Sequence, residues 1–141
     1  TIKQIVALAV LMPIVASMGG NAGTQTLTVA VRALATRELN QSNALRVFGK
    51  EILVGILNGI IFAIIVGLVA ALWFGEHGLG IVIALAMLFN LFVAGLFGAA
   101  IPLLLQRWKI DPALGASILL TTVTDVVGFF VFLGLAHIIL T

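Results

Sequence analysis

The chain has 141 residues, of which 62% are hydrophobic and only 9% are charged, and its formal net charge is +2. Soluble domains contain about 45–50% apolar and about 25% charged residues, so this composition excludes an ordinary soluble domain and indicates an integral membrane protein. The absence of cysteine excludes disulfides, thiolate metal sites and thiol nucleophiles.

Four stretches are long and apolar enough to cross a bilayer as helices, which takes about 20 residues each. They lack the period-two alternation of strands, and open strand edges are not tolerated in lipid. We therefore predict an all-α integral membrane fold in which residues 1–141 form one transmembrane domain. The predicted spans cover about residues 5–34, 52–74, 79–105 and 113–140.

The connections between the spans indicate their orientation. Connections 35–51 and 106–112 carry several Lys and Arg residues, whereas connection 75–78 carries none. Because loops rich in Lys and Arg remain in the cytoplasm, we expect the first two connections to be cytoplasmic and the third to lie outside, in a cell (inner) membrane. Both chain ends would then lie outside. We accordingly expect this sequence to be a fragment of a longer protein with one more span upstream.

The first span contains a run of small and polar residues between Met18 and Thr28. Within it, Asn21 and Gln25 are four residues apart, so a helix brings them to one face. We interpret this pair as part of a pore wall. The glycines of the same run fit helix packing equally well, because small residues let membrane helices approach closely.

The second and third spans show patterns typical of helix packing. The second contains Gly55 and Gly59 at four-residue spacing, and the third contains Ala86, Asn90, Ala94 and Gly98 in the same register. We interpret both as packing faces. A weaker alternative for Asn90 is contact with a permeating ion.

The fourth span contains Asp125, the only acidic residue well inside any predicted span. A carboxylate near the bilayer centre costs about 2.5–3.5 kcal/mol on insertion scales, and such residues usually face a bundle interior or a water-filled path. Ser117, Thr121 and Asp125 share one helical stripe, and Thr124 flanks it. The alternative is a neutral carboxylic acid that is hydrogen-bonded to a neighbouring helix. Asp111, before this span, is a plausible cap at the inner mouth.

These polar side chains offer carboxylate, hydroxyl and amide oxygens, which hard cations prefer. One carboxylate balances half of a divalent charge, so two copies of Asp125 in a two-fold dimer would balance one ion. Mg²⁺ keeps several of its waters and could be held by outer-shell hydrogen bonds. The membrane potential would drive its inward movement.

Four segments of the chain resemble the transmembrane domain of MgtE-type Mg²⁺ channels. They are PIVASMGGNAGTQ at 13–25, RALATR at 32–37, DPAL at 111–114 and TTVTDVVG at 121–128. The resemblance implies a homodimer with five spans per chain and a pore at the dimer axis, where Asp125 holds hydrated Mg²⁺. It also implies that the segment around Asn21 lines the pore and that Asp111 lies near a cytoplasmic gate. The family's first span and its cytoplasmic regulatory domains have no counterpart in this sequence.

We therefore expect a Mg²⁺ channel or transporter core. Asp125 is the expected main ion-binding residue, with Asn21, Thr121, Thr124 and Asp111 as further members of the site. Mg²⁺ is the expected transported ion, with Mn²⁺, Co²⁺ or Ca²⁺ as other candidates. No organic cofactor is expected. The expected partners are membrane lipid and a second copy of the chain, without nucleic acid.

Two other functions remain open at this point. In a proton-coupled cation transporter, Asp125 would carry a proton. In a non-conducting structural subunit, Asp125 would be a packing acid. An enzyme is not expected, because the sequence has no nucleophile–base pair or catalytic metal spacing.

Overall fold

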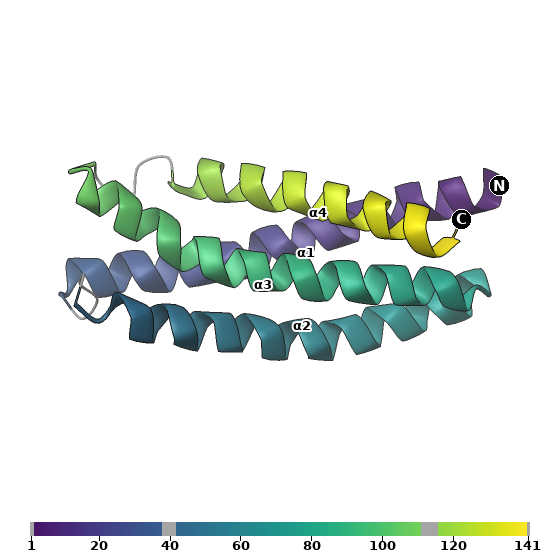
Figure 1. Ribbon diagram of the computed structural model, residues 1–141, viewed down its shortest axis with the longest axis horizontal. Coiled ribbons are helices and arrows are strands. Elements are labelled where there is room, and N and C mark those ends of the chain that lie inside the picture. The colour runs from purple at the N-terminus through teal and green to yellow at the C-terminus, as the bar shows by residue number, and fades with distance from the viewer. Residues whose placement is uncertain (1, 38–41, 111–115, 141) are drawn as a thin grey trace.

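A computed structural model describes residues 2–37, 42–110 and 116–140 as an elongated bundle in which consecutive helices run antiparallel (Figure 1). Each helix is long and apolar enough to cross a membrane, and the described residues contain no strand. The structure therefore confirms the predicted all-α membrane fold. The helices are α1 (Ile2–Ala35), α2 (Ala44–Phe74), α3 (His77–Arg107) and α4 (Ala116–Leu140).

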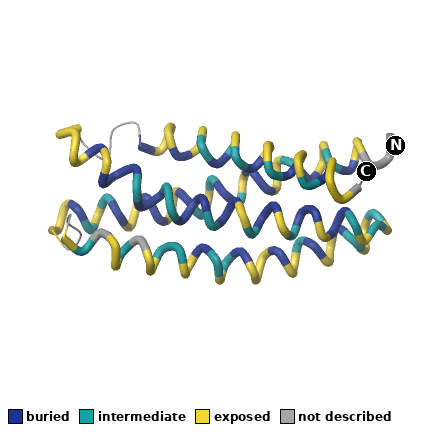
Figure 2. The backbone as a smooth tube through the Cα atoms, viewed as in Figure 1, coloured by how far each residue is buried: buried dark blue, intermediate teal, exposed yellow. Residues whose placement is uncertain are grey.

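Helix α3 lies at the centre of the bundle. It packs against all three other helices, whereas α2 and α4 share no contact within the described residues. In α3, 61% of the most apolar stretch is buried, compared with 22–28% in the other three helices. Figure 2 shows the same difference along the tube, with buried positions turned toward neighbouring helices and exposed positions on the outside. The outer surfaces of α1, α2 and α4 are thus the ones available to lipid or to a partner.

Glycines bring α2 and α3 into close contact along most of their length. A Cβ added at Gly80 would lie 2.6 Å from the carbonyl oxygen of Gly67, and one at Gly55 would lie 2.8 Å from that of Leu91. No side chain fits at such distances, so the two backbones touch directly. The predicted packing role of Gly55 and Gly59 is confirmed, since Gly59 lies against Leu88 in the same interface.

The packing face predicted on the third span is also confirmed. Ala86, Asn90, Ala94 and Gly98 are all buried. Gly98 meets α1, because a Cβ added there would lie 2.8 Å from the Cβ of Thr26. The largest hydrophobic cluster joins all four helices and includes Ala70 of α2 and Phe132 of α4, which is completely buried.

The basic residues gather at one end of the bundle. Six of the seven Lys and Arg residues belong to the end of α1, the start of α2 and the end of α3, which meet on the left of Figure 1. Arg37 and Lys109 follow α1 and α3 with φ of 64° and 61°, a left-handed conformation that closes a helix. The turn at Gly75 (φ 67°) lies at the opposite end, together with both termini.

Helix α2 begins eight residues before the span predicted from hydropathy, at Ala44 instead of residue 52. The added residues include Arg46 and Lys50, both exposed. A helix continues on main-chain hydrogen bonds after its apolar stretch ends, so the hydropathy pattern defines the membrane-crossing part and not the whole helix. The predicted start of span four at residue 113 lies outside the described residues.

Candidate cation site

The interface between α1 and α4 determines where the polar residues of these two helices lie. A Cβ added at Gly20 would lie 4.0 Å from Thr124 Oγ1, and one at Gly23 would lie 2.9 Å from Leu120 Cδ2. Asn21 and Asp125 directly follow Gly20 and Thr124 in the sequence. The two helices therefore bring Asn21 and Asp125 to about the same level along the bundle, since each residue advances a helix by about 1.5 Å.

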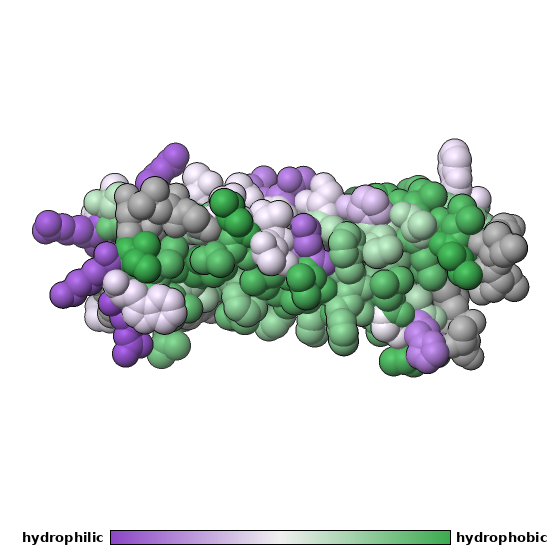
Figure 3. Space-filling view, turned by 90° about the horizontal axis from the view of Figure 1, so that it is seen from above, coloured by the Kyte–Doolittle hydropathy of each residue, from purple (hydrophilic) through white to green (hydrophobic). Residues whose placement is uncertain are grey.

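The polar side chains of these helices lie on the outer surface of the bundle. Asp125 is half-buried, while Thr121, Ser117 and Asn21 are exposed. We refer to these four residues as the polar strip. Figure 3 views the bundle from the side on which α4 is uppermost, and hydrophilic side chains gather there midway along a largely hydrophobic face. The polar strip thus faces away from the core of the single chain.

Thr124 differs from its neighbours on α4. Its side chain is completely buried, and its hydroxyl donates to the carbonyl oxygens of Leu120 and Thr121, each at 3.1 Å. The hydroxyl proton is therefore satisfied within α4, and the side chain fills the interface with Gly20. Of the five residues expected at the ion site, the structure brings Asn21, Thr121 and Asp125 to the outer surface and places Thr124 between the helices. Asp111 lies outside the described residues.

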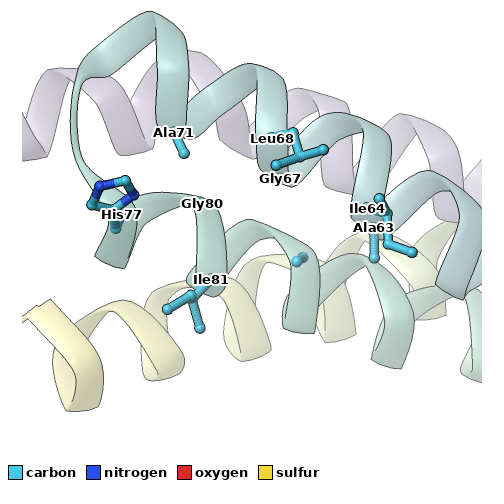
Figure 4. Close-up of a pocket in the computed structure, with 9 residues that line it drawn as sticks. Ala63, Ile64, Gly67, Leu68, Ala71, His77, Gly80 and Ile81 are labelled. Carbon is cyan, nitrogen blue, oxygen red and sulfur yellow. The ribbon is translucent and has the colours of Figure 1, made fainter.

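Three cavities in the described part of the chain are lined by residues outside the polar strip. A cavity of about 360 Å³ between α2 and α3 is lined mainly by small and aliphatic residues, with His77 at its edge (Figure 4). A cavity of about 580 Å³ between α2, α3 and α4 is lined only by apolar side chains. A smaller one, of about 170 Å³, is lined by residues of α1, α2 and α3. None of the three has a member of the polar strip among its lining residues.

Four-residue spacing pairs Asn21 with Gln25, but the smallest of the three cavities is lined by Gln25 alone of these two. Gln25 lines it together with Thr26 and Asn58, whereas Asn21 does not. Four-residue spacing gives only an approximate common face, because successive positions of this kind are rotated by about 40° around the helix. Asn21 and Gln25 therefore lie in different places: Asn21 belongs to the polar strip, and Gln25 lines the cavity between α1, α2 and α3.

For Asn90, the sequence indicates a packing role, with contact to a permeating ion as a weaker alternative. The structure confirms the packing role. Its side chain is completely buried, and Nδ2 donates to the main-chain carbonyl oxygen of Val15 at 3.0 Å. Its Oδ1 is buried without a hydrogen-bond partner in the described part of the structure. A buried acceptor of this kind costs about 1–3 kcal/mol.

The chemistry available on the polar strip is that of oxygen donors with one carboxylate. Within the described ranges, no group of three His, Cys, Asp or Glu residues could enclose a metal ion. A single chain therefore offers Asp125 with hydroxyl and amide neighbours, a set that suits a hydrated hard cation better than a dehydrated transition metal.

The MgtE family profile, which represents divalent cation transporters, matches residues 12–135. The chain is 35% identical to the magnesium transporter MgtE of Bacillus subtilis, over 96% of this chain and 30% of that protein. It is 39% identical to magnesium transporter MgtE of Thermus thermophilus, over 99% of this chain and 31% of that protein.

A third relative, magnesium transporter MgtE of Enterococcus faecalis, is 36% identical over 92% of this chain and 28% of its own length. The chain thus spans slightly less than a third of the length of these relatives. The profile match covers most of the chain, and the relatives align with it over nearly its whole length. The chain therefore belongs to the MgtE family of divalent cation transporters.

Proposed function

We propose that this chain forms the ion-conducting part of a Mg²⁺ channel or transporter. The observation that carries the proposal is the polar strip, which presents Asp125 with Asn21 and Thr121 on the outer surface of a membrane-spanning bundle. The relatives named as magnesium transporters support Mg²⁺ as the transported ion.

The exposure of the polar strip favours a second copy of the chain as its partner. A carboxylate turned toward lipid at mid-membrane depth is costly, and such residues face protein or water instead. If two chains meet along their strips, both Asp125 side chains leave the lipid and lie near a two-fold axis. Two carboxylates then balance the charge of one divalent ion, and closed two-fold dimers are the commonest oligomers.

Hydrated Mg²⁺ fits the side chains of the strip. Mg²⁺ loses its waters reluctantly and is often bound with several of them retained. In the proposed dimer, Asp125 accepts hydrogen bonds from the waters of the ion, while Asn21 and Thr121 bond to the same water shell. Such a site would distinguish ions by charge and hydrated size. Mn²⁺, Co²⁺ and Ca²⁺ are the ions against which this selectivity is to be measured.

The membrane potential supplies the driving force in this proposal. A divalent ion that crosses the whole membrane gains about 4.6 kcal/mol per 100 mV. The end of the bundle that carries six basic residues is proposed to be cytoplasmic, since Lys and Arg accumulate on that side. The protein would accordingly lie in a cell membrane with the Gly75 turn outside, and Mg²⁺ would move inward.

The proposal is tested by Mg²⁺ uptake into liposomes that contain the full-length protein and a Mg²⁺-sensitive dye. A potassium diffusion potential sets the voltage, and a protonophore abolishes the proton electrochemical gradient. We expect uptake to rise as the interior becomes more negative and to persist with the protonophore, relative to protein-free liposomes. Uptake that requires a pH gradient would instead establish proton-coupled transport. No uptake under either condition, with the dimer intact, would indicate a structural subunit.

A further inference from the structure

The side chain of Asn90 joins three helices in the middle of the bundle. From α3, its amide nitrogen donates to the carbonyl oxygen of Val15 on α1 at 3.0 Å. On α4, the amide faces Gly128, where an added Cβ would lie 2.9 Å from the same nitrogen. The amide therefore lies where α1, α3 and α4 meet.

Only glycine fits at the two positions that face this amide. A Cβ added at Gly19 would overlap Asn90 Nδ2 and lie 2.8 Å from its Cγ. The close contacts at Gly19 and Gly128 hold both helices against one rigid planar group. A displacement of α1 or α4 at these positions would change the contacts of that helix with Asn90.

Asn90 lies close to the polar strip along the bundle, although it points into the core. Gly19 precedes Asn21 by two residues, and Gly128 follows Asp125 by three, which corresponds to about 3 Å and about 4.5 Å along the helices. A shift of either helix at Asn90 would therefore be transmitted directly to the relative position of Asn21 and Asp125.

The unpaired carbonyl of Asn90 indicates that this residue is not optimal for stability. Its Oδ1 is buried without a partner in the described part of the chain, whereas an apolar side chain of similar size would leave no acceptor unsatisfied. Buried polar groups that cost stability in this way can fix one packing arrangement among several.

We propose that Asn90 is a positioning residue for the ion path. Its bond to Val15 and its contacts with Gly19 and Gly128 fix α1 against α4, and so hold Asn21 at the correct height beside Asp125. This inference rests on the proposed function, since it assumes that Asp125 and Asn21 act on one hydrated ion. Asn90 itself does not contact the ion.

The test measures Mg²⁺ uptake by the full-length protein in liposomes as a function of Mg²⁺ concentration. Asn90→Leu keeps the approximate size of the side chain but removes the bond to Val15. We expect the half-saturating Mg²⁺ concentration to rise about tenfold, with a loss of selectivity over Ca²⁺, as a displaced site would require. The matched control is Asn58→Leu, an amide on α2 that lines the cavity next to Gln25, and we expect it to leave both quantities unchanged.

A second pair of variants covers the possibility that Asn90→Leu fails to assemble. Gly19→Ala introduces a methyl group that overlaps the Asn90 amide, whereas in Gly19→Ala/Asn90→Ala the shortened side chain leaves room for it. We expect the double variant to assemble better than Gly19→Ala but to retain the raised half-saturation, because the bond to Val15 is still missing.

The outcomes separate this inference from the proposed function. If Asn90→Leu or the assembled double variant conducts with wild-type half-saturation and selectivity, Asn90 is only a packing residue and the inference is wrong. If wild-type protein conducts but Asp125→Asn has no effect, the proposed site fails first, and the positioning role fails with it. A merely structural role would lower the amount of assembled protein and leave half-saturation and selectivity unchanged.

Discussion

Gly20 on α1 lies opposite Thr124 on α4, and a Cβ at Gly20 would be in ordinary van der Waals contact with the threonine hydroxyl, at 4.0 Å. Thr124 is completely buried, whereas Thr121, three residues earlier on the same helix, remains exposed. Two threonines within one turn of α4 therefore have different surroundings. One packs between helices, and the other belongs to the polar strip.

This difference predicts that the same substitution has a large effect at one threonine and a small effect at the other. Thr121→Val removes a hydroxyl from the polar strip, and we expect Mg²⁺ uptake to fall several-fold because the water shell of the ion loses a hydrogen-bond partner. Thr124→Val removes a hydroxyl that, in the described part of the structure, bonds to Leu120 and Thr121 of its own helix, so uptake should stay within about twofold of wild type. Uptake by both variants in liposomes decides the point. Similar large losses in both variants would place both hydroxyls at the ion, and unchanged uptake in both would place neither there. Either result would contradict the prediction.

The glycine contact between α2 and α3 predicts a large effect on stability. Gly80→Ala would bring a methyl group within 2.6 Å of the carbonyl oxygen of Gly67 and push the helices apart. We expect a loss of about 1–3 kcal/mol, as found for overpacked cores. The measurement is the unfolding midpoint of the full-length protein in detergent micelles.

Gly134→Ala is the matched control for this experiment. Gly134 also lies within a helix, but a Cβ there would meet nothing within 4 Å. Since alanine is a better helix former than glycine by about 1 kcal/mol, the control should leave stability unchanged or raise it slightly. A destabilised Gly134→Ala combined with an unaffected Gly80→Ala would contradict the packing described for these helices.

The proposed dimer predicts a cross-link along the polar strip. The chain contains no cysteine, so a single Thr121→Cys introduces one thiol into this region. In a background whose other cysteines are replaced, a bifunctional thiol reagent long enough to span the hydrated ion should yield a covalent dimer, whereas a direct disulfide would need Cα atoms about 4.4–6.8 Å apart. Phe130→Cys is the control, because Phe130 is 78% exposed on another side of α4. Efficient cross-linking at residue 130 and none at residue 121 would show that the chains meet along a different face.

Much of the fold could be predicted from hydropathy, because the apolar stretches are long and the membrane leaves helices as their only simple structure. The packing faces could be predicted as well: the four-residue spacing of Gly55 with Gly59 and of Ala86 with Asn90 gives a direct signal of close contact. The start of α2 at Ala44 could not be predicted from hydropathy, because a helix can continue beyond its apolar residues.

The candidate site was only partly accessible from the sequence. Spacing grouped Ser117, Thr121 and Asp125, and the structure keeps them on one polar strip. Spacing could not tell that Thr124 is buried or that Gln25 lines a cavity that Asn21 does not line, since these outcomes depend on which helix packs on which side. The contact of Asn90 with Val15 joins residues 75 positions apart, and no local pattern specifies such a pair.

We propose that Mg²⁺ crosses the membrane beside Asp125, and the Asp125→Asn variant removes the charge on which this passage depends. This change keeps the size of the side chain, removes its charge and affects a half-buried position, so the dimer should remain intact. Uptake is measured in liposomes at a fixed potential without a pH gradient, with the amount of dimer determined in the same preparation. We predict that uptake per dimer falls by at least about tenfold, because a divalent ion loses both balancing charges. Wild-type uptake by an intact Asp125→Asn dimer would contradict the claim and require the ion path to lie elsewhere in the protein.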